Sequence, residues 1–246
     1  MRNIAVITGT SGAIGKSIAG RFKQANHLVC GIDLVEIENE NVDLFIKMDL
    51  NEFVINHDMQ AHLFSEIDRW IGENTIDALI NNAACQYVSR MHPIPAAELT
   101  KSYNVNAIAP YLLIANLVHR MTPGTGSVVN VGSIHSRLTK PGFIAYAATK
   151  AALAAMTRGL ALDFEDRIRI NCIEPASVET PMLLDGFKEF PEKMRELENF
   201  HPQRRIATPA EIAEMIFQIS SSKIRFLHGA CIDMSGGISG RLHDPA

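Results

Sequence analysis

Seven short runs of apolar and β-branched residues recur along the chain, separated by longer segments of mixed polarity. The runs cover residues 3–9, 27–34, 44–50, 76–84, 126–133, 168–175 and 230–236. Runs of this length and composition are typical of buried β-strands. The pattern therefore predicts a sheet of seven strands.

The longer segments carry apolar residues at helical spacing. They cover residues 14–25, 59–72, 97–121, 144–165 and 209–221. In the first of them, Ile14, Ile18 and Phe22 recur at i, i+4 and i+8, which places them on one face of a helix. Strands joined by helical crossovers form a parallel sheet that is covered on both faces. We therefore expect a doubly wound, seven-stranded α/β fold with its ligand site at the carboxyl ends of the strands. The chain shows no internal repeat or Gly/Ser linker, which predicts one domain over residues 1–246.

One segment departs from this alternation. Residues 181–205, PMLLDGFKEFPEKMRELENFHPQRR, are charged and contain three prolines. A connection of this length inside a compact domain is usually a lid or a binding loop, so we expect it to cover the active site. Its apolar residues Met182, Leu183, Leu184 and Phe187 indicate a substrate that is not wholly polar.

Composition excludes several classes of function. Of the 246 residues, 47% are hydrophobic and 20% are charged, and the net charge of −4 provides no basic field for nucleic acid. No apolar stretch approaches the roughly 18 to 20 residues that span a bilayer. The N-terminal MRNIAVITG enters a strand pattern directly, without a signal-peptide body. We therefore expect a soluble, cytoplasmic protein that acts on a small molecule and binds neither nucleic acid nor membrane.

The cysteines and histidines give no sign of a disulfide or a metal site. Cys30, Cys85, Cys172 and Cys231 lie far apart without CxxC spacing, and the nine histidines show neither HxxxH nor HxH spacing. We expect reduced thiols that behave as small apolar side chains, no disulfide and no metal.

A glycine-rich turn follows the first predicted strand and opens the first predicted helix. Gly9, Gly12 and Gly15 let the backbone turn tightly and approach a pyrophosphate, which the free N–H groups of the helix N-terminus then bind. Asp33 ends the second strand, where a carboxylate accepts hydrogen bonds from the adenosine ribose hydroxyls and repels a 2′-phosphate. Neither Gly12 nor Leu34 supplies a compensating cation, so the pattern favours NAD over NADP. A plain βα turn followed by a solvated acid is the alternative reading.

Tyr146 and Lys150 lie four residues apart at the start of a predicted helix, which places them on one face. A tyrosine with an ordinary pKa near 10 needs about 4 kcal/mol of phenolate stabilisation to titrate near pH 7. An ammonium about 5 Å away contributes on the order of 3 kcal/mol at an effective dielectric of 20. The pair is therefore a candidate general acid/base. Ser133 ends the strand before it, where its hydroxyl would meet a substrate carbonyl.

With these motifs in order, the chain resembles the short-chain dehydrogenase/reductase family, of the single-domain type, over nearly its whole length. TGTSGAIG matches the family's TGxxxGxG turn with Ala13 in place of a glycine, and NNAA matches NNAG with Ala84 in place of the glycine. CIEPASVET resembles the PGxVxT segment with Ala176 in place of glycine, and MSGG resembles VDGG with Ser235 in place of aspartate. The resemblance implies a Rossmann-like fold, and the helices and last strand of such proteins commonly build a homotetramer.

The resemblance also implies a set of cofactor-binding residues. They are Gly9, Ser11, Gly12, Ala13, Ile14, Gly15, Asp33, Asp49, Leu50, Asn82, Ala83, Ala84, Tyr146, Lys150, Pro175, Val178 and Thr180. In the family's roles, Asp49 contacts the adenine with Leu50 packed beside it. The Val178 backbone and the Thr180 hydroxyl bind the nicotinamide carboxamide, and Asn81 braces the sheet.

Four catalytic roles follow from the same resemblance. Tyr146 transfers the proton, Lys150 lowers its pKa and holds the cofactor ribose, and Ser133 orients the substrate oxygen. Asn106 holds a water that links Lys150 to solvent, with Asn104 as the alternative assignment.

Three further residues are candidates for substrate contact: His135, Arg137 and Gln86. The alternatives are a surface histidine hydrogen-bonded to the lid and a solvated loop arginine. The substrate stays open between a hydroxy acid, a polyol and a hydrophobic alcohol.

The sequence thus predicts an NAD-dependent oxidoreductase that acts on a secondary alcohol or ketone. A catalytically inactive NAD-binding sensor on the same fold is the main alternative. Non-redox chemistry such as dehalogenation is a third, which the presence of Lys150, Asp33 and Gly15 opposes.

Overall fold

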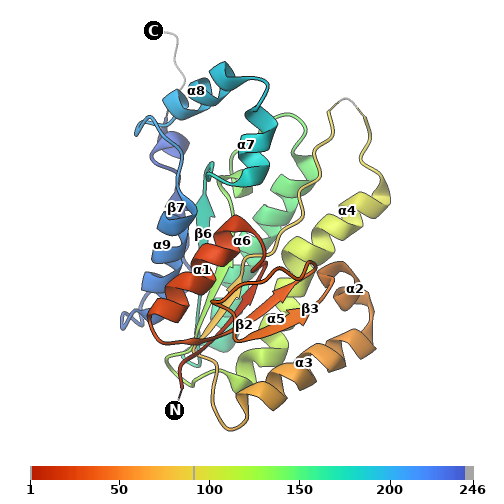
Figure 1. Ribbon diagram of the computed structural model, residues 1–246, viewed down its shortest axis with the longest axis vertical. Coiled ribbons are helices and arrows are strands. Elements are labelled where there is room, and N and C mark those ends of the chain that lie inside the picture. The colour runs from red at the N-terminus through yellow and green to blue at the C-terminus, as the bar shows by residue number, and fades with distance from the viewer. Residues whose placement is uncertain (1, 91, 242–246) are drawn as a thin grey trace.

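A single parallel sheet of seven strands forms the centre of the molecule, in a computed structural model that describes residues 2–90 and 92–241 (Figure 1). The strand order is β3-β2-β1-β4-β5-β6-β7. The strands are β1 (Ile4–Thr8), β2 (Leu28–Asp33), β3 (Leu44–Lys47), β4 (Ala78–Asn81), β5 (Ser127–Val131), β6 (Arg169–Pro175) and β7 (Cys231–Met234). Each lies inside a run that the sequence predicts as a strand, so the seven-stranded, doubly wound α/β architecture is confirmed. The order reverses between β1 and β4, which places a crevice at the carboxyl ends of the central strands.

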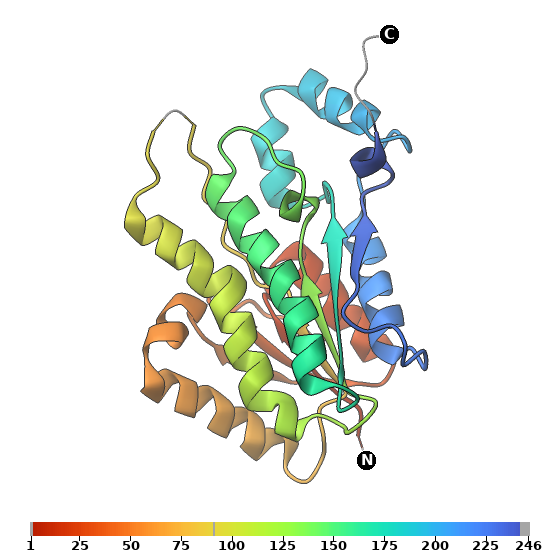
Figure 2. The ribbon, with the colours of Figure 1, turned by 180° about the vertical axis from the view of Figure 1, so that it is seen from behind.

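Helices cover both faces of the sheet, and two separate apolar cores fill the spaces between. On one face, Ile18 and Phe22 of α1 (Ala13–Gln24) pack with Ile212 and Ile216 of α9 (Pro209–Ser221). The other core includes side chains from α3 (His57–Ile71), α5 (Ala109–Leu117) and α6 (Ile144–Phe164), and Figure 2 shows α4 (Ala96–Tyr103) on the same side. Neighbouring residues of β1 enter opposite cores, which explains why the strands are continuous apolar runs.

The predicted helix over residues 97–121 is interrupted. It consists of α4, a π-helical turn η1 (Asn104–Ile108), α5 and a short 3-10 turn η2 (Val118–Arg120). Pro110 lies at the start of α5 and has no N–H to donate to the preceding turn, and the Ala109 N–H bonds to the Asn104 carbonyl five residues back. The apolar spacing predicts the helical run but not this change of hydrogen-bond pattern.

The segment 181–205 is largely helical rather than an irregular loop. It forms α7 (Pro181–Phe187) and α8 (Pro191–Phe200), which lie beyond the carboxyl ends of β6 and β7 (Figure 1). Two of its prolines occupy the first position of a helix, where the missing N–H costs nothing, so they start helices instead of breaking them. The sequence also misses the short helix α2 (Leu50–Ile55), whose first residue lies at the end of a predicted strand. Two 3-10 turns, η3 (Ile134–Ser136) and η4 (Ile238–Gly240), follow β5 and β7.

Within residues 2–90 and 92–241, no helix combines the length and apolar character needed to cross a bilayer. The same part of the chain contains no group of three or more His, Cys, Asp or Glu side chains placed to hold a metal ion.

Candidate active site

The glycine-rich turn lies at the carboxyl end of β1 and is built around two positions that exclude a side chain. Gly9 has φ of 75°, and a Cβ there would come within 2.7 Å of the Asn82 side chain. A Cβ on Gly15 would come within 1.9 Å of the Gly9 carbonyl oxygen. Gly12 caps α1 without a side-chain acceptor. The first N–H groups of α1 therefore keep the capacity to bind an anion, as a dinucleotide pyrophosphate requires.

Asp33 ties the end of β2 to this turn. Its carboxylate accepts hydrogen bonds from the Ser11 N–H at 2.9 Å and from the Val35 N–H at 3.2 Å. Asp49 accepts a hydrogen bond from the Asn51 N–H at 2.8 Å and so caps α2, and Leu50 beside it is buried. Asp33 ends β2, and Asp49 follows the end of the adjacent strand β3 by two residues, so both acids lie at the same edge of the sheet.

The NNAA turn after β4 packs directly on the glycine turn. The Asn82 side chain donates to the carbonyl oxygens of Thr8 and Gly9 at 3.0 and 3.1 Å. The Ala83 N–H donates to the Thr8 hydroxyl at 3.0 Å. Asn81 points the other way and donates to the Asn130 side chain at 2.8 Å, which braces β4 against β5.

Ser133, Tyr146 and Lys150 come together at the carboxyl end of β5. Ser133 is 6% exposed, and its hydroxyl accepts from the His135 N–H at 3.2 Å and donates to the Pro175 carbonyl at 3.5 Å. The Lys150 side chain is almost fully buried, and its Nζ donates to the Val131 carbonyl at 2.6 Å. The same Nζ lies 5.6 Å from the centre of the Tyr146 ring.

Burial controls the protonation of this pair. It raises the pKa of the Tyr146 phenol, and a hydrogen bond with the Ser133 side chain acts in the opposite direction without cancelling the effect. Burial also lowers the pKa of Lys150 to about 8. Burial therefore leaves the phenol protonated at pH 7, whereas the sequence predicts that Lys150 supplies a large part of the phenolate stabilisation. The reason is that desolvation, which spacing does not reveal, disfavours both charged forms.

The π turn η1 aims Asn106 at α6. Its amide donates to the Cys85 carbonyl at 2.8 Å and to the Thr149 hydroxyl at 3.0 Å, and its oxygen accepts from the Cys85 N–H at 2.7 Å. Asn104 turns to the opposite side and donates to the Asn51 side chain at 2.9 Å. Asn106, and not Asn104, therefore contacts Thr149, the residue before Lys150.

His135 forms an aromatic cluster with Phe143 and Tyr146. The His135 and Phe143 rings are stacked, with centroids 4.9 Å apart and planes at 11°. The His135 ring meets Tyr146 edge to face, with centroids 5.8 Å apart. Burial lowers the pKa of His135, and the Lys140 charge lowers it further, so the ring is neutral at pH 7. Its Nδ1 is buried without a hydrogen-bond partner among the described residues.

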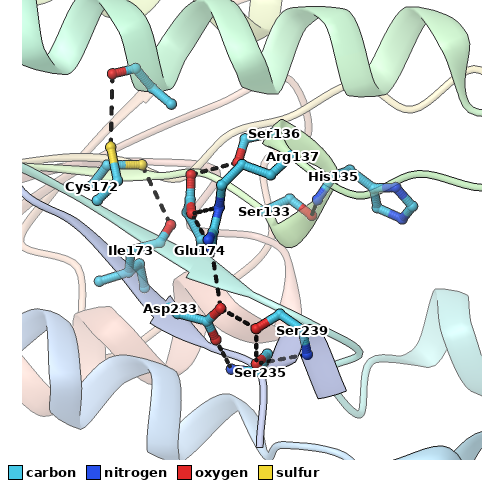
Figure 3. Close-up of polar contacts among 12 residues, drawn as sticks. Ser133, His135, Ser136, Arg137, Cys172, Ile173, Glu174, Asp233, Ser235 and Ser239 are labelled. Carbon is cyan, nitrogen blue, oxygen red and sulfur yellow. Dashed lines mark hydrogen bonds and ion pairs between the residues drawn. The ribbon is translucent and has the colours of Figure 1, made fainter. Parts of the chain in front are cut away.

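Arg137 is held by two carboxylates that the sequence analysis did not single out (Figure 3). Its guanidinium lies 2.9 Å from Glu174, which is 1% exposed, and 3.0 Å from Asp233 on β7. The Ser136 hydroxyl donates to the second Glu174 oxygen at 2.5 Å. We call Ser136, Arg137, Glu174 and Asp233 the carboxylate clamp. An acid inside the apolar run IRINCIEP was the signal that could have revealed it.

The remaining predicted residues lie at the same edge of the sheet. Pro175 ends β6, and Val178 is buried and forms a β-bridge with Ala207. The Thr180 hydroxyl accepts from the Leu183 N–H at 3.3 Å and caps α7. Gln86 is exposed in the segment after β4.

The chain is similar to known enzymes over nearly its whole length. A family model described as enoyl-(acyl carrier protein) reductase matches residues 9–239. The chain is 28% identical to 2-(R)-hydroxypropyl-CoM dehydrogenase of Xanthobacter autotrophicus, over 96% of this chain and 98% of that protein. The fold is similar to that of ligand-free aldohexose dehydrogenase of Thermoplasma acidophilum, with a TM-score of 0.91 and 24% identity over 100% of this chain and 97% of that one.

Other solved structures with this fold hold different cofactors. 4-Hydroxyisoleucine dehydrogenase complexed with NADH has a TM-score of 0.85 at 23% identity, covering 98% of this chain and 100% of that one. ElxO with NADP bound has a TM-score of 0.84 at 22% identity, with the same coverage. At this identity the likeness concerns the fold alone. From its family match, its sheet and its ordered motifs together, the chain belongs to the short-chain dehydrogenase/reductase family of oxidoreductases.

Proposed function

We propose that the protein is an NAD-dependent oxidoreductase that transfers a hydride between NAD(H) and a secondary alcohol or ketone. The observation that carries this proposal is the convergence of Ser133, Tyr146 and Lys150 at the end of β5, two strands along the sheet from the glycine turn. Asn106 supports the group from the opposite helix.

The side chains divide the work of proton transfer. Tyr146 gives a proton to the substrate oxygen during reduction and takes it back during oxidation, while the Ser133 hydroxyl donates a hydrogen bond to the same oxygen. Lys150, with a pKa lowered to about 8, exchanges protons near neutrality, and Asn106 lines its route to solvent. The nicotinamide, when bound, supplies or accepts the hydride. Because the phenol is protonated at pH 7 in the chain by itself, oxidation of an alcohol needs a positive charge beside Tyr146 in addition to that of Lys150.

The glycine turn fits a dinucleotide. Gly9 and Gly15 leave room that any Cβ would fill, and the start of α1 offers unpaired N–H groups to a pyrophosphate. We propose that Ser11, Gly12, Ala13 and Ile14 line this site, together with Asp49, Leu50, Asn82, Ala83 and Ala84 on the adenosine side and Pro175, Val178 and Thr180 on the nicotinamide side.

Asp33 supports a preference for NAD. Its carboxylate is fixed by two backbone N–H groups, and Glu36 and Glu38 follow it closely, so a 2′-phosphate would meet like charge. Lys47 is the Cα partner of Asp33 on β3 and is the cation that NADP would have to recruit. We expect Asp33→Ala to shift the ratio of NADP to NAD dissociation constants about tenfold toward NADP, a change of about 1.4 kcal/mol. Tighter binding of NADP than of NAD by the unaltered protein would contradict this reading.

His135 is the residue that we propose contacts the substrate. It is neutral, lies against Tyr146 and carries an unpartnered ring nitrogen. Arg137 has less to offer a substrate because two carboxylates already hold it. The stacked Phe143 ring provides an apolar wall, which suits an alcohol of mixed polarity.

The experiment is a screen of alcohols and ketones followed by NADH absorbance, with Tyr146→Phe as the test variant. We expect Tyr146→Phe to lose at least about a hundredfold in turnover, as removal of a general acid typically does. Tyr111→Phe is a matched control because Tyr111 lies exposed on α5. Near-normal turnover by Tyr146→Phe would refute the mechanism, whereas tight NAD binding without any turnover would favour the sensor.

We also propose a cytoplasmic homotetramer. Large apolar side chains are exposed at Ile108 and at Leu162 on α6, and others lie before β7 at Ile224 and Phe226, which is 99% exposed. Exposed apolar side chains of this kind are what subunit interfaces bury. Sedimentation equilibrium would test this, and a monomer at micromolar concentration would contradict it.

A further inference from the structure

Two cysteines that hydride transfer does not use lie side by side beneath the catalytic group. Cys172 on β6 and Cys231 on β7 are Cα partners in the parallel sheet. Parallel neighbours lie about 4.7 to 4.9 Å apart, inside the roughly 4.4 to 6.8 Å over which a disulfide joins two Cα atoms. Directly paired residues project to the same face of a sheet, and the Cys231 thiol donates to the Ala154 carbonyl of α6 at 3.7 Å on that face. The two thiols are close enough for each to shift the pKa of the other.

The two thiols differ in exposure and acidity. Cys231 is partly exposed, and the neighbouring Cys172 thiol lowers its pKa to about 7, helped by Arg158, whose Nη1 lies 3.6 Å from the Cys231 sulfur. Cys172 is fully buried, and the neighbouring Cys231 thiol together with burial raises its pKa well above the ordinary value. Cys231 is thus the nucleophile of the pair and Cys172 the protonated second thiol.

We propose that Cys172 and Cys231 form a reversible disulfide when the protein meets hydrogen peroxide, and that this bond lowers turnover at the neighbouring site. The Cys231 thiolate attacks a peroxide oxygen, the O–O bond breaks, and hydroxide leaves with the formation of a sulfenic acid. Cys172 sulfur then attacks Cys231 sulfur, the S–O bond breaks, and the second oxygen leaves as water with the Cys172 proton. The dithiol loses two electrons and two protons, and peroxide becomes two waters.

The disulfide would affect turnover through Gly132, an inference that rests on the proposed function. A Cβ at Gly132 would come within 2.6 Å of the Cys172 sulfur, so that sulfur lies against the Gly132 backbone. Gly132 joins Val131, which accepts the Lys150 hydrogen bond, to the catalytic Ser133. Figure 3 shows Cys172 on the strand that also carries Glu174 of the carboxylate clamp.

Bond formation requires movement. The Cβ atoms of a parallel pair lie about as far apart as the strands, whereas a disulfide prefers a Cβ separation of roughly 3.5 to 4.5 Å. Closing the bond therefore draws Cys172 toward β7 and away from Gly132. A bond made under such strain is readily reduced, which makes the modification reversible.

The test treats the full-length protein with peroxide and analyses its peptides by mass spectrometry. We expect a linked peptide pair lighter by two hydrogen atoms, a fall in turnover of about tenfold, and recovery of both on adding dithiothreitol. Cys231→Ala should neither cross-link nor respond to peroxide, and Cys85→Ala should respond as the unaltered protein does.

Different results overturn different parts of the proposal. Oxygen addition at Cys231 without loss of the two hydrogens, or equal inhibition of Cys231→Ala, would overturn the disulfide. A complete disulfide with unchanged turnover would overturn its coupling to the site. The mass measurement needs no activity, so the thiol pair is tested even if no alcohol or ketone is turned over.

Discussion

Replacing Lys150 with methionine should stabilise the protein while it abolishes turnover. Lys150 is fully buried, and burial lowers its pKa from the ordinary 10.5 to about 8. Each pKa unit corresponds to 1.36 kcal/mol, so holding the ammonium inside the fold costs about 3 kcal/mol. Methionine has a similar length and no charge. The variant also loses the hydrogen bond from Lys150 to the Val131 carbonyl, which costs roughly 1 kcal/mol. The net stabilisation of Lys150→Met at pH 7 is therefore about 2 kcal/mol.

The pH dependence identifies the cause. Below about pH 8 the lysine is charged in both the folded and the unfolded chain, and the full cost is present. Between about 8 and 10.5 the folded chain has lost the proton while the unfolded chain retains it, so the stability of the unaltered protein rises with pH. The advantage of the methionine variant should therefore shrink across that interval and vanish near its upper end.

Urea unfolding at pH 7 and pH 10, at one protein concentration, measures this difference. Lys101→Met is the matched control because Lys101 is exposed on α4, and we expect its effect to stay within about 0.5 kcal/mol at both pH values. A Lys150→Met variant that is less stable than the unaltered protein at pH 7, or whose advantage is the same at both pH values, would refute the argument. In either case the buried ammonium would not be the source of the cost.

Three further predictions concern the frame around the site. Gly15→Ala should destabilise the fold by about 2 kcal/mol or more, because its Cβ would lie 1.9 Å from the Gly9 carbonyl oxygen. Gly12→Ala is the control and should have little effect on thermal stability, since its Cβ would lie 3.6 Å from the same oxygen. Arg137→Met should lower the free energy of unfolding in urea by about 2 kcal/mol, because it leaves the buried Glu174 carboxylate without its cation. This value is below the usual cost of breaking a buried ion pair because the Arg137 side chain is 55% exposed. Thr208→Ala should cost about 1 kcal/mol by removing the capping box at the start of α9, measured by thermal unfolding.

Each of these has a result that contradicts it. Equal melting temperatures for Gly15→Ala and Gly12→Ala would show that the turn is not as tight as its geometry indicates. Adding Glu174→Gln to Arg137→Met should recover part of the lost stability, since a neutral amide replaces the unpaired charge. A double variant no more stable than Arg137→Met would place the effect elsewhere. An unchanged melting temperature for Thr208→Ala would mean that the N-terminus of α9 is held by other contacts.

Features that depend on local pattern could be predicted from the sequence. All seven strands lie within the predicted runs, and Gly9 and Gly15 occupy positions where a side chain has no room. The preference for Asn106 over Asn104 rests on the family resemblance. The structure gives a physical distinction between them, because the Asn106 side chain contacts α6 and the Asn104 side chain contacts α2.

Features that depend on partners distant in the chain could not be predicted. Arg137 reads as a free loop cation in the sequence, but its partners are Glu174 and Asp233 on two other strands. Likewise, the spacing of Tyr146 and Lys150 gives their proximity and not their desolvation, which decides the direction of both pKa shifts. The helices α7 and α8 were missed because proline was read as an interruption when it occupies the first helical position.

The carboxylate clamp has a consequence for the order in which the molecule assembles. The Asp33 contact with Ser11 spans 22 residues of chain, whereas the Arg137 contact with Asp233 spans 96. Closing the longer loop costs about 1 kcal/mol more in chain entropy, and contacts of high sequence separation form late in folding. We therefore expect the contact between Asp33 and the glycine turn to form before the carboxylate clamp closes. The turn that carries Ser133 would then be among the last parts of the molecule to become fixed.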